Sequence, residues 1–160
     1  MTDERSRLAT LAASADPDDR QSALAAIETT SEPWAVPLLR GLLKDSLAAI
    51  RSASVEALER RAAILTQPTM EALVAVAERD PDPETRRGAV RALGRMLAVP
   101  TAPRRHVIRR VLRAALADPL VRLVAQRALS AAEGPTATAA HETRRKASAR
   151  QRLAGNEPPE

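Results

Sequence analysis

The stretch Asp80–Leu97, with the sequence DPDPETRRGAVRALGRML, decides the fold of this chain of 160 residues. It opens with two Asp-Pro pairs, which favour a turn. Small and apolar residues then recur every three to four positions, and this spacing predicts an amphipathic helix with one buried face. Asp82 and Pro83 suit the start of that helix, because an acid caps unpaired N–H groups and proline is tolerated in the first turn.

The same pattern recurs in four segments, each of which begins with an arginine. Three, six and seven positions after the arginine stand a small residue, an alanine and a large aliphatic residue, and these positions share one helical face. A repeat of this length indicates stacked structural units. The arginines are Arg20, Arg51, Arg86 and Arg122, offset by 31, 35 and 36 residues; they precede Ala23, Ser54, Ala89 and Ala125, then Ala26, Ala57, Ala92 and Ala128, then Ile27, Leu58, Leu93 and Leu129.

A second amphipathic run precedes each of these segments, so the chain reads as four helical hairpins. The first runs cover residues 5–14 and 33–44 and begin at Pro68 and near Pro103. Asp16-Pro17 and Asp118-Pro119 repeat the Asp82-Pro83 pattern and predict two further capped helix starts. We expect a repeat domain over residues 1–133, with repeats at about 3–31, 32–65, 67–98 and 103–133.

The composition favours helix throughout. Trp34 is the single aromatic residue, while Ala, Leu, Arg and Glu abound. We expect Trp34 to pack in the seam between repeats rather than to anchor a ligand. Residues 134–160 are polar and basic, lack an apolar stripe, and are expected to be partly helical or disordered.

The second and third segments resemble HEAT repeats, a family that forms right-handed α-solenoids of stacked antiparallel helix pairs. The second segment has Pro37 in its first run, Asp45 eight residues later and Arg51 at the opening of its second run. The third keeps the interval of six residues between acid and arginine, from Asp80 to Arg86. The fold class is therefore expected to be an all-α, HEAT-like solenoid of about four hairpins.

In the HEAT family the Asp and Arg form hydrogen bonds between neighbouring repeats. The resemblance implies such a ladder for Asp45, Arg51, Asp80 and Arg86. No acid stands six residues before Arg20 or Arg122. The outer repeats therefore have no implied ladder role, which is in keeping with terminal repeats that cap a stack.

Several classes of function are disfavoured by the sequence. There is no cysteine, which excludes disulfides and thiolate chemistry, and no apolar run long enough to span a bilayer. His106 and His141 stand alone, without a second ligand at a suitable spacing. We therefore expect no enzymatic activity, no cofactor or metal, no small-molecule ligand and no membrane contact, and we expect a cytoplasmic location.

The arginines of the aligned helices are the candidate partner-binding residues. Positions one, five and nine after the aligned arginine form an outward stripe opposite the alanines, and in HEAT arrays the second helices line the concave face. We assign no structural partner to Arg87, Arg91 and Arg95 of this stripe. The alternative to a binding patch is a solvated polar face, partly neutralised by Glu56. The expected contacts are Arg60, Arg87, Arg91, Arg95 and Arg127.

These observations predict a non-enzymatic interaction module or scaffold that binds an acidic or extended protein partner on the concave face. The alternative is a nucleic-acid-binding protein, because residues 101–154 hold 12 Lys and Arg against 3 Asp and Glu. No aromatic residue interleaves these cations, so binding would depend on phosphate contacts. The possible contacts are Arg105, Arg109 and Arg113, with Arg144, Arg145 and Lys146 in the tail.

Overall fold

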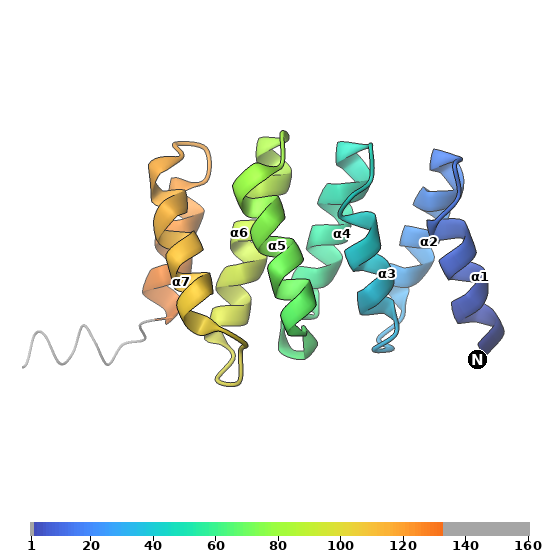
Figure 1. Ribbon diagram of the computed structural model, residues 1–160, viewed down its shortest axis with the longest axis horizontal. Helices are drawn as coiled ribbons and strands as arrows, with labels where there is room; N and C mark the ends of the chain where they lie inside the picture. Colours follow the sequence, from blue (N-terminus) through green and yellow to red (C-terminus); the bar gives the residue numbers. More distant parts are fainter. Residues whose placement is uncertain (1, 133–160) are drawn as a thin grey trace, which may run out of the picture.

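The computed structural model describes residues 2–132, and it folds them into helices joined by short turns (Figure 1). Residues 122–132 are helical and complete a fourth hairpin with α7. The other helices are α1 (Thr2–Ala12), α2 (Pro17–Thr29), α3 (Ala35–Leu42), α4 (Ala48–Arg60), α5 (Gln67–Arg79), α6 (Pro83–Ala98) and α7 (Arg105–Ala114), with short 3₁₀ helices η1 (Ala62–Ile64) and η2 (Ala115–Ala117).

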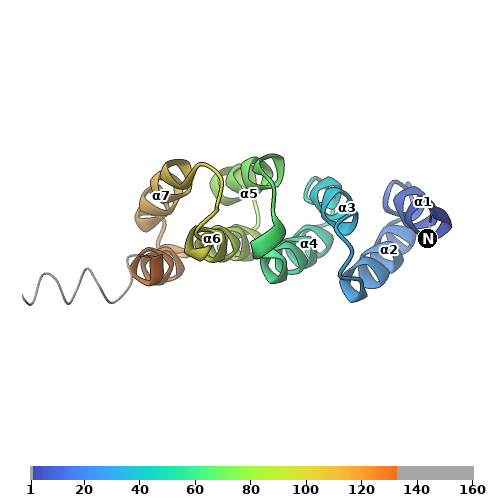
Figure 2. The same cartoon turned by 90° about the horizontal axis from the view of Figure 1, so that it is seen from below.

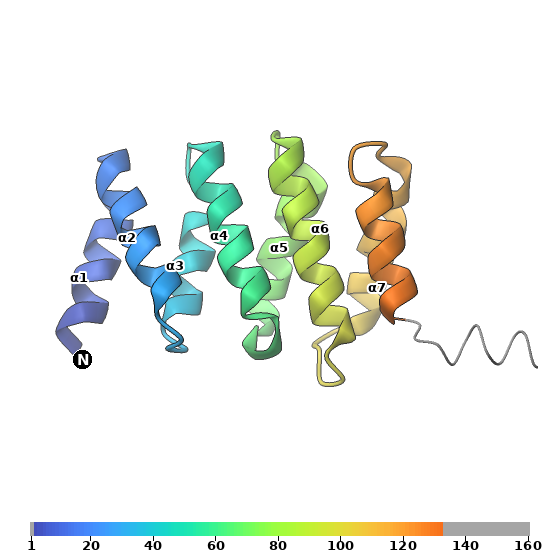
Figure 3. The same cartoon turned by 180° about the vertical axis from the view of Figure 1, so that it is seen from behind.

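The helices alternate between two layers. The first-helix layer holds α1, α3, α5 and α7, and the second-helix layer holds α2, α4, α6 and the helix of residues 122–132 (Figures 2 and 3). The prediction of an all-α solenoid of stacked antiparallel hairpins is confirmed. The expectation for the tail, residues 134–160, concerns a part of the chain outside the described residues.

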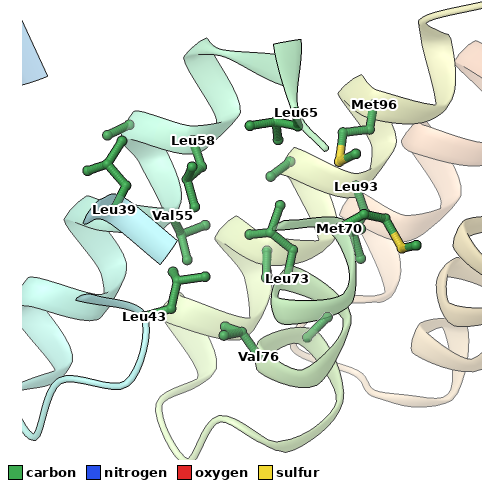
Figure 4. Packing of buried hydrophobic residues seen from close by; sticks show 14 of the residues in the cluster. Leu39, Leu43, Val55, Leu58, Leu65, Met70, Leu73, Val76, Leu93 and Met96 are labelled. Atoms are coloured by element: carbon green, nitrogen blue, oxygen red, sulfur yellow. The ribbon is translucent and has the colours of Figure 1, made fainter. Parts of the chain in front are cut away.

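The core follows the predicted pattern. A column here means the residues that stand the same number of positions after the aligned arginine in the four repeats. The small residues Ala23, Ser54, Ala89 and Ala125 are fully buried. Figure 4 shows how Leu39, Leu58, Leu73 and Leu93, which are all fully buried, gather between the two layers of the middle repeats. Half-buried Trp34 packs against the same core. Ala26, in the first repeat, is the exception in its column, because it is exposed.

An arginine–aspartate ladder joins each repeat to the next. Arg20 Nε lies 2.5 Å from Asp45 Oδ2, and Arg51 Nε lies 2.7 Å from Asp80 Oδ2. The hydrogen bonds implied by the family resemblance are therefore present. Each arginine also donates to backbone carbonyls of the turn within its own repeat, as Arg51 does to Asp45 at 2.9 Å. The ladder thus fixes both the turn and the stacking of neighbouring hairpins.

The ladder extends into both outer repeats, for which the resemblance implied no ladder role. Arg20 needs no acid in its own repeat, because its partner comes from the following one. At the other end, Arg86 Nη2 donates to Asp118 Oδ2 at 3.1 Å. Asp118 also accepts from the backbone N–H of Leu120 at 2.9 Å, as Asp80 accepts from Asp82 at 3.0 Å.

Asp118 is therefore the structural counterpart of Asp80, not of the helix cap Asp82. Asp82 caps α6 by accepting from the backbone N–H of Thr85 at 2.8 Å, as predicted. After Asp118 the chain forms a turn, and the helix begins at residue 122, later than the sequence pattern predicts. The fourth turn is shorter than the third, so its acid stands four residues before Arg122 instead of six.

These interactions shift the pKa values of the turn carboxylates. Burial alone would raise the pKa of Asp45, but hydrogen bonds from Arg20 and from the Leu47 backbone hold it below its ordinary value. The backbone N–H of Leu120, assisted by Arg86, lowers the pKa of Asp118 despite partial burial. The native fold therefore favours the ionised form of both groups.

Candidate binding site on the second-helix layer

The five arginines of the predicted stripe all lie on the second-helix layer, with their side chains at least partly exposed. The side chains of Arg60 and Arg95 are 53% and 63% exposed, and those of Arg87 and Arg91 are close to half exposed. Arg127 is exposed on the helix of residues 122–132. The helical periodicity therefore gave the outward direction of the stripe correctly.

The expectation that the α6 arginines have no structural partner is wrong. Arg87 forms an ion pair with Glu84 in the preceding turn of α6. Arg91 and Arg95 both pair with Glu59 of α4, through Nε atoms that lie 2.6 and 2.8 Å from its two carboxylate oxygens. Arg91 and Arg95 thus contact the neighbouring repeat, which sequence spacing within one helix does not reveal.

Glu59 is a functional candidate that the sequence analysis missed. Its side chain is only 7% exposed, so its charge is compensated by the two arginines rather than by water. With Nε held by Glu59, the terminal Nη groups of Arg91 and Arg95 make no hydrogen bond to another described residue. The carboxylate thus orients two guanidinium groups whose outer donors are open to a ligand.

The position of Glu59 identifies a second series of ion pairs between repeats. Glu59 stands eight residues after its aligned arginine, and Glu28 occupies the same column one repeat earlier. Glu28 pairs with Arg60 of the following repeat, at 2.9 Å. The signal in the sequence is therefore a glutamate in column eight that faces an arginine in column five or nine of the next repeat.

The third repeat breaks this series, because its column-eight residue is Gly94. A β-carbon on residue 94 would lie 2.5 Å from the β-carbon of Ala128, so glycine is required for the close approach of α6 and the last described helix. Arg127, in column five of the fourth repeat, accordingly has no ion-pair partner among residues 2–132. Among the described residues, the missing glutamate therefore leaves both a hollow and a cation without a paired carboxylate.

The hollow is a groove of about 310 Å³, here called the Gly94 groove. Three of the five predicted contact residues, Arg91, Arg95 and Arg127, stand at its walls. Arg60 and Arg87 do not line it. The remaining lining residues are small or apolar: Gly94 and Ala98 from α6, and Val124, Ala128 and Ala131 from the facing helix. An apolar floor between guanidinium groups suits a ligand that carries both apolar and acidic groups.

The described residues that were predicted to contact nucleic acid lie on the other layer. Arg105, Arg109 and Arg113 belong to α7, in the first-helix layer. Arg105 has a structural role, because its Nη1 donates a hydrogen bond to the carbonyl of Val99 at 2.6 Å. The tail candidates Arg144, Arg145 and Lys146, together with His141, lie outside the described residues. Among the described residues, the two predicted arginine sets therefore lie on different layers.

The described region holds no group of three or more His, Cys, Asp or Glu side chains that could bind a metal ion. His106 is exposed on α7. Within residues 2–132, no helix has the length and apolar character that crossing a bilayer requires.

Comparison with known proteins finds similar solved structures. No protein-family model and no curated protein matches the chain. The structure of human deoxyhypusine hydroxylase in complex with glycerol is similar to it, with a TM-score of 0.64 and 24% sequence identity. The match covers 81% of this chain and 43% of the hydroxylase chain, so the chain spans less than half the length of that protein. A likeness at this level of identity establishes the α-solenoid fold and leaves the activity open.

The comparison corrects three expectations. The assignment to the HEAT repeat family is not supported by a family model, and what the similarity supports is a HEAT-like fold. The expectations of a non-enzymatic scaffold, with a nucleic-acid-binding alternative, and of no enzymatic activity are also overturned. The expectation of no enzymatic activity depended on the lack of cysteine and on the isolated histidines. A solenoid similar to this one belongs to an enzyme, so this fold is compatible with catalysis.

Proposed function

We propose that the chain recognises an acidic segment of another protein in the Gly94 groove. The observation that carries this proposal is the break in the glutamate series at Gly94, beside Arg127. At each of the two preceding junctions the fold supplies a carboxylate to the arginines of the next repeat. At the third junction a carboxylate from a partner would complete the same arrangement. The proposal concerns binding and applies equally to a substrate and to a lasting partner.

The local charge supports an anionic ligand. Arg91, Arg95 and Arg127 surround the groove, and Glu59 is the carboxylate that pairs with two of them. A guanidinium group can donate two parallel hydrogen bonds to one carboxylate, which gives orientation as well as attraction. Because the groove is open to solvent, we expect the affinity to fall with rising ionic strength.

Along the rest of the stripe the charge is largely balanced. Arg60 pairs with Glu28 and Arg87 pairs with Glu84. A long polyanion laid across the second-helix layer would therefore meet acids as well as arginines. The layer fits a short acidic segment at one groove better than a continuous phosphate backbone.

Fluorescence anisotropy with a labelled acidic peptide tests the proposal. Peptide binding should weaken about tenfold in Arg127→Glu, which corresponds to about 1.4 kcal/mol. Arg60→Glu is the matched control, because Arg60 is exposed on the same layer but does not line the groove. A second peptide with glutamine in place of glutamate should bind far more weakly. Equal losses in the two variants, or binding of a random DNA duplex in preference to the peptide, would overturn the proposal.

A further inference from the structure

We infer that the acidic segment binds the Gly94 groove as an amphipathic helix, with an apolar face on the floor and carboxylates beside the arginines. This inference rests on the proposed function and goes further by naming the conformation and the residue pattern of the partner. It depends on three features of the groove: its helical walls, its floor of small residues and the spacing of its arginines.

The walls are helical on both sides. One wall is α6 and the other is the helix of residues 122–132, so their backbone N–H and C=O groups are already paired within each helix. An extended segment pressed between them would bury peptide groups that find no backbone partner. A helix satisfies its own backbone and needs only side-chain contacts, which is the usual mode of recognition in a groove between helices.

The floor is shaped for protruding side chains. Gly94 lets the two walls approach closely, while Ala98, Ala128 and Ala131 leave the space above them unfilled. A row of larger side chains on a third helix can therefore fit between the walls, as ridges fit into grooves in helix packing. Leu123, which is 58% exposed, lies one helical turn before Arg127 and extends the apolar surface beyond the groove.

The arginines set the acidic pattern of the partner. Arg91 and Arg95 are four residues apart on α6, which places them one turn, or about 6 Å, apart along the helix axis. Carboxylates four residues apart on a partner helix have the same spacing. Arg127 stands on the opposite wall, so acids on both flanks of an apolar stripe would meet cations on both sides.

The chain's own tail does not have this chemistry. Residues 134–160 contain Arg144, Arg145, Lys146, Arg150 and Arg152 against three glutamates, Glu142, Glu157 and Glu160. A net positive segment would face the arginines of the groove with a charge of the same sign. The occupant that fits by charge is therefore a segment of another protein.

Two peptides of identical composition test the inference on the full chain. One places leucines on a single helical face with glutamates on both flanks, and the other scrambles the same residues so that no such face exists. The amphipathic peptide should bind at least tenfold more tightly by anisotropy, and its circular dichroism should show added helix on binding. Both peptides carry the same net charge, so charge alone predicts equal binding.

A groove-filling variant supplies the second measurement. Ala98→Leu should remove the preference for the amphipathic peptide, because the added side chain occupies the groove while the charge is unchanged. Ala98 and Ala25 are both exposed on the second-helix layer, so Ala25→Leu is the matched control and should keep the preference. Circular dichroism of the proteins confirms that both variants fold.

The outcomes separate the inference from the proposed function. If both peptides bind equally and Arg127→Glu weakens both, the acidic site stands and the helical inference is wrong. If neither peptide binds, both are wrong. If the amphipathic peptide binds more tightly but Ala98→Leu leaves the preference intact, the helix binds elsewhere and the inference about the groove is wrong.

Discussion

Gly94 of α6 faces Ala128 of the following repeat so closely that a β-carbon on residue 94 would lie 2.5 Å from the β-carbon of Ala128. The contact joins two roles. It sets the distance between the last two repeats, and it removes the glutamate that stands in the same column of the two earlier repeats. The junction that requires glycine is therefore also the one at which Arg127 has no carboxylate partner among residues 2–132.

Gly94→Ala should destabilise the protein by about 1–3 kcal/mol, because the added methyl group forces two packed helices apart. Urea unfolding measures the loss. Gly41→Ala is the control, since a β-carbon there meets nothing within 4 Å. Alanine in the interior of α3 should stabilise the fold by about 0.4–1 kcal/mol. Equal effects at the two glycines would contradict the close approach.

Breaking the Arg51–Asp80 pair should lower the stability of the protein more than breaking an exposed ion pair does. Their side chains are 10% and 4% exposed, so Arg51→Ala leaves a buried carboxylate without its cation. We expect a loss of about 3–5 kcal/mol in the free energy of unfolding. In the exposed Arg60–Glu28 pair, Arg60→Ala should cost at most about 1 kcal/mol. A similar loss of stability in both variants would show that the buried ladder pair contributes no more to stability than the exposed pair does.

The ladder shows what sequence periodicity can and cannot give. The columns of small and large residues placed Ala89 and Leu93 in the core, because burial within a helix follows from its own period. The interval from Asp80 to Arg86 identified the ladder in the middle repeats. The roles of Arg20 and Asp118 were missed, because each partner lies in another repeat and the fourth turn is two residues shorter than the third.

The sequence predicted on which layer the candidate site lies, but it did not predict the ion pairs within the site. Helical spacing placed Arg91, Arg95 and Arg127 on one layer, but it could not show that two of them share Glu59. That contact depends on how α6 of the third repeat packs on α4 of the second, where a β-carbon on Gly88 would lie 3.1 Å from Val55 Cγ1. A column-by-column comparison of opposite charges in successive repeats would have found Glu59 and the gap at Gly94.

Stability should fall in acid. Hydrogen bonds from Thr85 hold the pKa of Asp82 below its ordinary value of 3.8, and the pKa values of Asp45 and Asp118 are also lowered. Each group therefore contributes stability that is fully present above pH 3.8 and is lost as the pH falls through its lower folded value. Urea unfolding at pH 7, 5 and 3 should show little change between the first two and a clear loss at the third.

Asp118→Asn separates this effect from general acid denaturation. The variant should be less stable than the parent at pH 7, and the difference should shrink at pH 3, where the native carboxylate is increasingly protonated. A difference that is independent of pH would mean that the Asp118 carboxylate contributes through its shape and not through its charge.

An internal carboxylate should compete with the proposed partner. Ala131 lines the Gly94 groove and is exposed, so Ala131→Glu places a carboxylate near Arg127 without disturbing the core. The variant should give Arg127 a carboxylate partner one turn along its own helix, and it should weaken acidic-peptide binding about tenfold, or about 1.4 kcal/mol. Ala131→Gln has nearly the same shape without the charge, so a smaller loss there would assign the effect to electrostatics. Equal losses of binding in the two variants would show that the added side chain blocks the groove by its size. The charge of the carboxylate would then make no contribution to the competition.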